Sequence, residues 1–116
     1  MAFGVMGGDM QPQGHAKVLI NLIDFGMNLQ EAGDAPRFHH SGSSEPTGRV
    51  MANGGVLHIE DGVPDAIIEE LRRRGHSIAP EPVAAYGGYQ AIYRDPASGS
   101  YAGATEKRKD GCALGY

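Results

Sequence analysis

The chain has 116 residues, a formal net charge of −4 and 41% hydrophobic residues, a composition typical of one soluble globular domain. No stretch approaches the roughly 18 to 20 uninterrupted apolar residues of a membrane-spanning helix, and the acidic balance offers no clustered cationic surface for phosphates. We therefore expect a single domain over residues 1–116 that binds neither membrane nor nucleic acid. The N-terminal residues lack the charged and apolar regions of a signal peptide, and both a cytoplasmic and a periplasmic location stay open.

The first part of the chain predicts a strand followed by a helix. Residues 2–6, AFGVM, form a short apolar run that ends at Gly7 and Gly8. From Pro12 onward, apolar residues recur at helical spacing and polar residues lie between them. Proline suits an early helical position because its missing N–H has no partner there. The apolar positions are Val18, Leu19, Leu22, Ile23 and Met27.

A second, short helix and a strand are expected next. Asn28 and Glu31 have the spacing of a capping box, and the helix that they start must end near Ala35 because a proline follows. Residues 37–40, RFHH, can form a strand. It leads into SGSSEPTG over residues 41–48, a polar stretch typical of a surface loop.

The middle of the chain predicts two short strands and an amphipathic helix. Residues 49–62 read as two strands around Asn53 and Gly54, a pair compatible with a hairpin. Pro64 to Arg74 predicts a helix, because acidic residues come early, basic residues come late and Gly75 follows at the stop. Its inward positions are Ile67, Ile68 and Leu71.

Three further strands complete the expected fold. They lie at residues 76–80, 89–95 and 100–105, and the last two are joined by a loop rich in turn residues. The order of elements predicts an α+β protein in which helices pack on a mostly antiparallel sheet.

Gly7 and Gly8 are the first candidate site. Backbone N–H groups at a helix start are unpaired and lie at the positive end of the helix. A glycine pair just before the helix could therefore point its amides at a developing negative charge, as an oxyanion hole requires. A plain tight turn is the alternative, because glycine pairs serve that purpose commonly.

The other polar residues give weaker signals. None of the five histidines forms His-x-x-x-His, and the adjacent His39 and His40 would point to opposite faces of a strand. We expect no metal and no cofactor. The single cysteine, Cys112, excludes an internal disulfide, and it could pair with a histidine only through the fold. No serine or threonine stands in a nucleophile-elbow context; the candidates are Ser41, Ser43, Ser44, Thr47 and Thr105.

Long motifs of the chain resemble the gamma-glutamyltransferase (gamma-glutamyltranspeptidase) family. GVMGGDMQPQGHAKVLINLIDFGMNLQEAGDAPRFHH resembles the C-terminal half of the small subunit, in the branch close to cephalosporin acylases, and the similarity continues through PDAIIEELRRRGH, GGYQAIYRD and YAGATEKRKDGCALGY. It covers essentially the whole chain. The resemblance implies part of the αββα fold of N-terminal-nucleophile hydrolases, whose precursors cut themselves into a large and a small subunit.

The resemblance also implies the chemistry. In the family, the new N-terminal threonine of the small subunit attacks a gamma-glutamyl amide, and the acyl group passes to water or to an amino acid. Gly7 and Gly8 correspond to the glycine pair whose amides form the oxyanion hole. No nucleophile lies in this chain, so the fragment alone should be inactive and its partners are the large subunit and the N-terminal part of the small subunit.

Departures from the family leave alternatives open. Asp9, Met10 and Gln11 replace the Ser-Arg that follows the glycine pair in the best-known members, so an acylase with a non-glutamyl amide substrate is possible. A free-standing, non-catalytic module that binds a small anion or a partner chain is the other reading. Strands that lack their natural neighbours leave unpaired edges and uncovered apolar faces, which drive association. We therefore expect the isolated chain to form an oligomer or a domain-swapped dimer.

Overall fold

The computed structural model describes residues 1–42 and 53–115, which fold into two compact units. The first unit comprises β1 (Ala2–Met6), α1 (Met10–Ile23), α2 (Leu29–Asp34), the short 3-10 helix η1 (Val83–Tyr86), β5 (Gly88–Arg94) and β6 (Tyr101–Thr105). The second unit comprises β2 (Phe38–Ser41), β3 (Val56–Ile59), α3 (Asp65–Arg73) and β4 (Ile78–Ala79). The expectation of a single domain stays a prediction.

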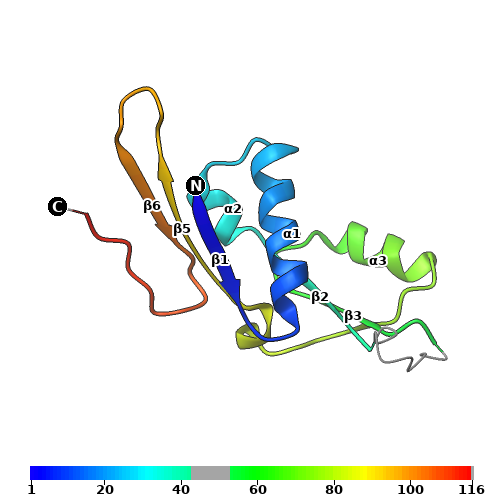
Figure 1. Cartoon of the computed structure of the whole chain (residues 1–116). Helices are drawn as coiled ribbons and strands as arrows, with labels where there is room; N and C mark the ends of the chain where they lie inside the picture. Colours follow the sequence, from blue (N-terminus) through cyan, green and yellow to red (C-terminus); the bar gives the residue numbers. More distant parts are fainter. Residues whose placement is uncertain (43–52, 116) are drawn as a thin grey trace. The chain divides into compact units, whose positions relative to one another are not determined.

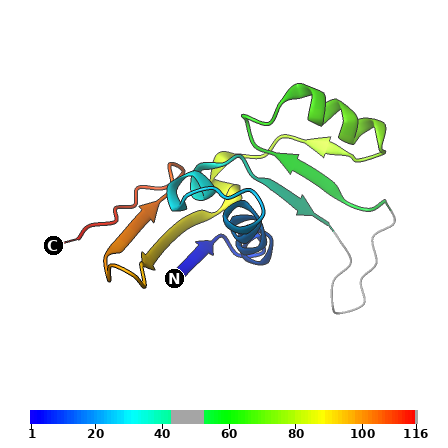
Figure 2. The ribbon, with the colours of Figure 1, turned by 90° about the horizontal axis from the view of Figure 1, so that it is seen from above.

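The first unit is a three-stranded antiparallel sheet in the order β1-β5-β6. Its register places Val5 opposite Tyr89 and Ala91 opposite Ala104. α1 and α2 lie on the same face of this sheet (Figures 1 and 2). Val18 of α1 completes the core with these four residues, and its side chain is fully buried. The predicted strands at 2–6, 89–95 and 100–105 are thus confirmed, and so is the α+β class.

Two glycines bring the helices of this unit directly onto the sheet. A Cβ atom on Gly14 of α1 would lie 2.6 Å from Cγ1 of Val5, and one on Gly33 of α2 would overlap the ring of Tyr89. Both glycines are buried. Helix and strand backbones therefore approach more closely than any side chain would permit, because the space of each missing side chain is filled by a core residue from the sheet.

α1 is shorter at its C-terminal end than its apolar pattern predicted. The helix starts at Met10, so Pro12 lies in its first turn, but it ends at Ile23, and Met27 lies beyond it. Ile20 and Ile23 are 45% and 74% exposed, so the expected inward position of Ile23 is wrong. The apolar stripe is wider than the sheet surface that covers it. Among the described residues, no helix is long and apolar enough to span a membrane.

The capping box of α2 is present as predicted. Oδ1 of Asn28 accepts the N–H groups of Gln30 and Glu31 at 3.0 and 2.9 Å, while the Glu31 carboxylate accepts the Asn28 N–H at 2.9 Å. The helix ends at Asp34 with Ala35 as its C-cap, directly before Pro36. These reciprocal bonds satisfy three backbone donors that a helix start otherwise leaves unpaired.

The segment after β6 is fastened to the C-terminal end of α2. Arg108 and Glu106 form an ion pair at 2.6 Å whose side chains are both inaccessible to solvent. Arg108 also donates to the carbonyl oxygens of Gly33 and Ala35, each at 2.8 Å. A cation at these last carbonyls is favourable because the negative end of the helix dipole lies there. The basic run at 107–109 therefore has a structural role.

The second unit is a sheet in the order β2-β3-β4, antiparallel between β2 and β3 and parallel between β3 and β4. α3 is confirmed, with Pro64 as its N-cap and Gly75 in the left-handed region just beyond its end. Its apolar side faces a hollow of about 570 Å³. The hollow is lined by Phe38, Leu57, Ile59, Ile67 and Leu71, among others. Ile67 nevertheless stays 51% exposed. The first of the two strands predicted within 49–62 lies largely outside the described residues.

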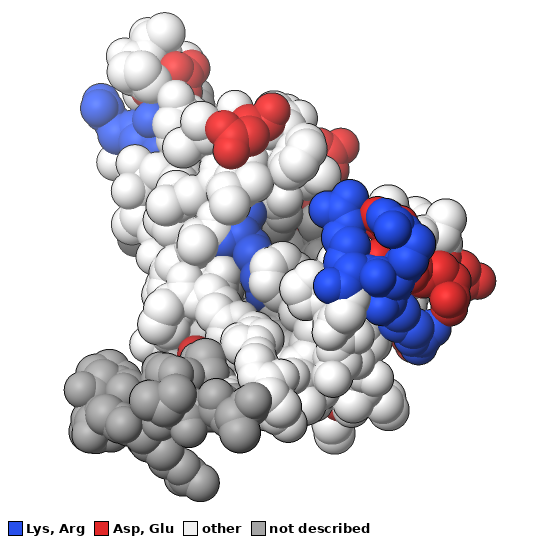
Figure 3. Space-filling view, turned by 90° about the vertical axis from the view of Figure 1, so that its right-hand side faces the viewer, with Lys and Arg blue, Asp and Glu red and all other residues white. Residues whose placement is uncertain are grey.

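The basic triplet of α3 is neutralised on the helix itself. Arg72 pairs with Glu69, and both Arg73 and Arg74 pair with Glu70, at 2.5 to 2.7 Å. Figure 3 shows these blue and red side chains interleaved on one face. Exposed pairs of this kind add little stability, but the cluster offers no unpaired cationic patch.

The close contact at Gly33 generates a stability prediction. Replacing a helical glycine with alanine ordinarily stabilises a helix by up to about 1 kcal/mol. In Gly33→Ala the new methyl group would overlap the buried Tyr89 ring, so we expect a net destabilisation of about 1–3 kcal/mol. Urea unfolding followed by circular dichroism measures it. Gly115→Ala, whose Cβ has open space around it, is the control. A Gly33→Ala protein as stable as the parent would contradict the packing described.

Asp34 generates a prediction of pH dependence. Burial by itself raises the pKa of Asp34, but hydrogen bonds from Gln30 and the Lys107 N–H, with the charges of Lys107 and Arg108, outweigh burial and lower this pKa. Because the folded pKa lies below the unfolded value, the carboxylate stabilises the fold above about pH 4 and loses that effect as the pH falls further.

The matching experiment compares Asp34→Asn with the parent between pH 3 and 7. We expect the variant to be less stable at pH 7 by under about 1 kcal/mol, because the group is partly solvated, and the gap to close toward pH 3. Asp61→Asn, at an exposed position, is the control for removing one carboxylate. A gap that persists at low pH would show that the charge of Asp34 is not its source.

Candidate functional site

The candidate site is the corner between β1 and α1, formed by Gly7 and Gly8. Their φ angles are 136° and 57°, in the region that side chains rarely adopt. The Gly7 carbonyl accepts the N–H of Met10 at 3.1 Å, and the Gly8 carbonyl accepts the N–H of Gln11 at 3.0 Å. These two bonds close the first turn of α1 and leave the preceding amides outside it. The predicted glycine corner is therefore present.

The two amides of this corner are not used by the backbone hydrogen bonds of the described residues. Both glycines are exposed, and within the described part of the chain neither N–H donates a hydrogen bond to another backbone group. Asp9, the N-cap of α1, makes no side-chain bond to the helix start. Free N–H groups at the N-terminal end of a 14-residue helix favour a negative charge through both hydrogen bonding and the helix dipole.

A hollow of about 390 Å³ lies beside the corner. Met6, Gln11, His15 and Gln90 contribute to its lining. His15 on α1 also faces β1, because its Nε2 accepts the N–H of Val5 at 3.1 Å. The imidazole is thus held in place by the strand that leads into the corner.

A third glycine, Gly87, meets this corner from a distant part of the chain. A Cβ atom on Gly7 would lie 3.0 Å from Cα of Gly87. The sequence shows Gly87 and Gly88 only as another glycine pair at a junction, and nothing local indicates that they contact Gly7. The register of β1 on β5, which pairs Met6 with Gly88, brings them together.

The histidines of the second unit do not form a metal centre. His39 and His58 lie directly opposite each other on β2 and β3, with ring centroids 5.8 Å apart. Across residues 1–42 and 53–115, no group of three or more His, Cys, Asp or Glu side chains could hold an ion. On the sequence alone, His39 and His40 are the histidine pair weighed as ligands on one strand. The cross-strand pairing depends on a register that spacing along the chain does not reveal.

Ser41 and His58 form a hydrogen-bonded pair, and no described residue supplies the third member of a catalytic triad. Ser41 Oγ lies 2.8 Å from His58 Nε2, whereas His58 Nδ1 is buried with no partner in the described residues. The nearby carboxylate of Glu81 bonds to His39 instead, at 2.9 Å. A base without an orienting carboxylate is poorly suited to activate a hydroxyl. Three other candidates, Ser43, Ser44 and Thr47, lie outside the described residues.

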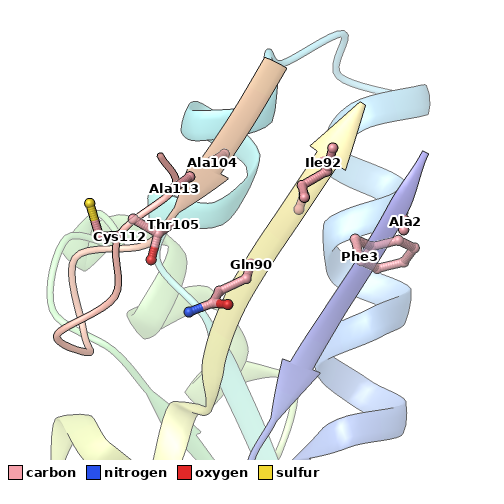
Figure 4. Close-up of a pocket in the computed structure, with 9 residues that line it drawn as sticks. Ala2, Phe3, Gln90, Ile92, Ala104, Thr105, Cys112 and Ala113 are labelled. Atoms are coloured by element: carbon pink, nitrogen blue, oxygen red, sulfur yellow. The ribbon is translucent and has the colours of Figure 1, made fainter. Parts of the chain in front are cut away.

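Cys112 and Thr105 lie together on another surface. They line a hollow of about 330 Å³ with residues of β1 and β5 (Figure 4), and no histidine is among its lining residues. The segment that carries Cys112 lies against β6, since a Cβ atom on Gly103 would be 2.8 Å from that of Ala113. The Cys–His pairing considered from the sequence therefore has no counterpart in this hollow.

The strand, glycine corner and helix on an antiparallel sheet define part of an N-terminal-nucleophile hydrolase fold. The structure superposes on the cephalosporin acylase from Bacillus halodurans with a TM-score of 0.79 and 44% sequence identity, covering 98% of this chain and 20% of that one. The expected fold class is confirmed.

Sequence comparisons identify the family. The family model described as gamma-glutamyltranspeptidase matches residues 1–116, and the chain belongs to this family. It is 39% identical over 95 residues to the acylase ACY 1 proenzyme of Pseudomonas sp. strain SE83, with coverage of 82% of this chain and 14% of the relative. It is 36% identical over 121 residues to the oxamate amidohydrolase proenzyme of Klebsiella pneumoniae, with coverage of 100% and 21%. The chain thus spans about a fifth or less of these relatives.

Proposed function

We propose that this chain is the C-terminal part of the small subunit of a gamma-glutamyltransferase-like enzyme and supplies its oxyanion hole. In this proposal, the N–H groups of Gly7 and Gly8 donate to the oxygen of a tetrahedral intermediate. The nucleophile, an N-terminal threonine, lies outside these residues. The chain also provides a large share of the scaffold that holds the corner.

The observation that carries this proposal is the pair of free amides at the start of α1. Oxyanion-hole donors must be fixed before the reaction, because reorganisation during the step would cost the energy that they provide. Here Val5 and Met10, on either side of the corner, are 2% and 1% exposed. The corner is thus anchored at both ends, while Gly7 and Gly8 themselves are exposed.

The substrate class that fits is a carboxylic amide. Among the relatives, one is named an acylase and another an amidohydrolase; acyl transfer from an amide proceeds through a tetrahedral oxyanion. Family membership supports gamma-glutamyl amides of the glutathione type. The similarity to the acylases, and Asp9 and Gln11 beside the corner, support a non-glutamyl amide as the alternative.

The partners that we propose are the remaining parts of the same precursor. The two curated relatives are proenzymes several times longer than this chain, which covers 14% and 21% of them. The first unit leaves large apolar side chains exposed, including Ile92 at 55% and Tyr101 at 72%. Such a surface is typical of an interface. For the isolated chain, association into an oligomer or a domain-swapped dimer stays a prediction.

The role of Gly8 is tested in the whole precursor. No atom lies within 4 Å of a Cβ placed on Gly8, so the side chain of Gly8→Val meets open space, and its cost is the backbone strain of valine at a φ of 57°. We expect kcat to fall on the order of 100-fold with a smaller change in KM, because the interaction strengthens only as charge develops.

Gly26→Ala is the matched control for this experiment. Gly26 has a φ of 64° and equally open surroundings, and it lies beyond the opposite end of α1. It therefore carries similar backbone strain without touching the corner. Self-cleavage and melting temperature are checked first. Near-normal turnover of a processed, folded Gly8→Val enzyme would remove Gly8 from the active site.

In this proposal the nucleophile lies outside the chain, and a second prediction follows from its position. Purified residues 1–116 should hydrolyse neither a gamma-glutamyl anilide nor a simple acyl anilide, because an oxyanion hole without a nucleophile has no intermediate to stabilise. The whole precursor is the positive control in the same assay. Turnover that scales with the 116-residue chain and persists through repurification would place the nucleophile inside this chain and overturn the proposal.

A further inference from the structure

Gly87 lies in a close backbone contact of the first unit. Its φ is 78°, and it is buried. A Cβ atom there would overlap the carbonyl oxygen of Met6 and lie 2.9 Å from Cγ1 of Val5. The last residues of β1 thus occupy the space that a side chain at position 87 would need.

The same glycine also contacts the corner itself. Cα of Gly87 lies 3.0 Å, and its nitrogen 3.6 Å, from the position of a Cβ on Gly7. Cγ of Met10 lies 3.6 Å from the position of a Cβ on Gly87. Gly87 therefore touches the strand end, the corner and the helix start, the three parts that set the direction of the Gly7 and Gly8 amides.

The segment around Gly87 is more firmly fixed than the corner. Tyr86 and Tyr89 are each 1% exposed, and Gly88 is paired with Met6 in the sheet. In contrast, Gly7 and Gly8 are exposed and the Met6 side chain is 53% exposed. If an atom is added between the two segments, the less tightly packed one must move. The segment that moves is the corner.

From these contacts we infer that Gly87 is a positioning residue for the oxyanion hole, holding the Met6–Gly7 backbone in place. The inference rests on the proposed function of Gly7 and Gly8. It assigns a role in catalysis to a residue about 80 positions away in the chain, one that touches no reacting atom. Displacements of about 1 Å at a reacting centre can lower rates on the order of 100-fold.

The test is Gly87→Ala in the whole precursor, after self-cleavage and melting temperature have been measured. We expect kcat to fall about 10- to 100-fold with less than about a threefold change in KM, because the ground state depends little on the oxyanion contact. Gly75→Ala is the control. Its φ of 92° is also unfavourable for alanine, but a Cβ there has nothing within 4 Å, so it adds strain without displacing the corner and should keep its kcat.

A second measurement covers the case in which Gly87→Ala blocks self-cleavage. The two subunits are then expressed as separate chains, already divided at the maturation site, and the assembled enzyme is assayed and crystallised. We expect the Met6 carbonyl and the Gly7 amide to shift while Tyr86 and Tyr89 keep their positions. A crystal structure in which the tyrosines move and the corner stays would overturn the inference, as would a normal kcat.

The outcome is separable from that of the proposed function. A low kcat in Gly8→Val together with a normal kcat in folded Gly87→Ala would reject the positioning role and keep the oxyanion hole. A normal kcat in Gly8→Val would reject the oxyanion hole, and the positioning role with it. Low kcat in both variants, with unchanged Gly26→Ala and Gly75→Ala controls, would support both.

Discussion

The contact between Gly7 and Gly87 is the constraint on which the first unit depends. It brings the end of β1 against the segment that starts β5. The position of β1 at the edge of the sheet and the start of α1 therefore both depend on this contact. Glycine suits both positions, because both residues have positive φ, a Cβ on Gly7 would lie 3.0 Å from Cα of Gly87, and a Cβ on Gly87 would overlap the Met6 carbonyl oxygen. The geometry of the candidate site is therefore a consequence of how β1 pairs with β5.

Close contacts at glycines also pack the two helices of the first unit onto the sheet. Gly14 and Gly33 let α1 and α2 lie against Val5 and Tyr89. The resulting core is small. The end of α2 is held by the Arg108–Glu106 pair, whose side chains are inaccessible to solvent. A buried pair of this kind costs desolvation, and its additional hydrogen bonds to backbone carbonyls offset that cost. The close glycine contacts fix α1 and α2 on the sheet, and the buried ion pair fixes the segment after β6 to α2.

The proposed chemistry explains why so few polar groups converge here. An oxyanion hole needs only backbone amides that are fixed in place, and the corner provides these without a catalytic side chain. The pair formed by His39 and Glu81 belongs to the second unit, and Arg108 with Glu106 fastens the segment after β6 to α2. In the proposal, the nucleophile and the groups that bind the acyl donor come from the rest of the precursor.

The sequence by itself determined the features that depend on neighbouring residues. Asn28 and Glu31 predicted the capping box of α2, Gly75 the end of α3, and Gly7 with Gly8 the corner before α1. Each follows from local backbone geometry, in which the partners lie a few residues apart. The family was likewise readable from the sequence, because its motifs are long and retain their order.

Only the tertiary structure decided which distant residues meet. Strand register places His39 opposite His58 and brings Gly87 onto Gly7, and a shift of one residue would have reversed both faces. These outcomes are set by the pairing of segments far apart in the chain, and periodicity along the sequence carries no information about that pairing.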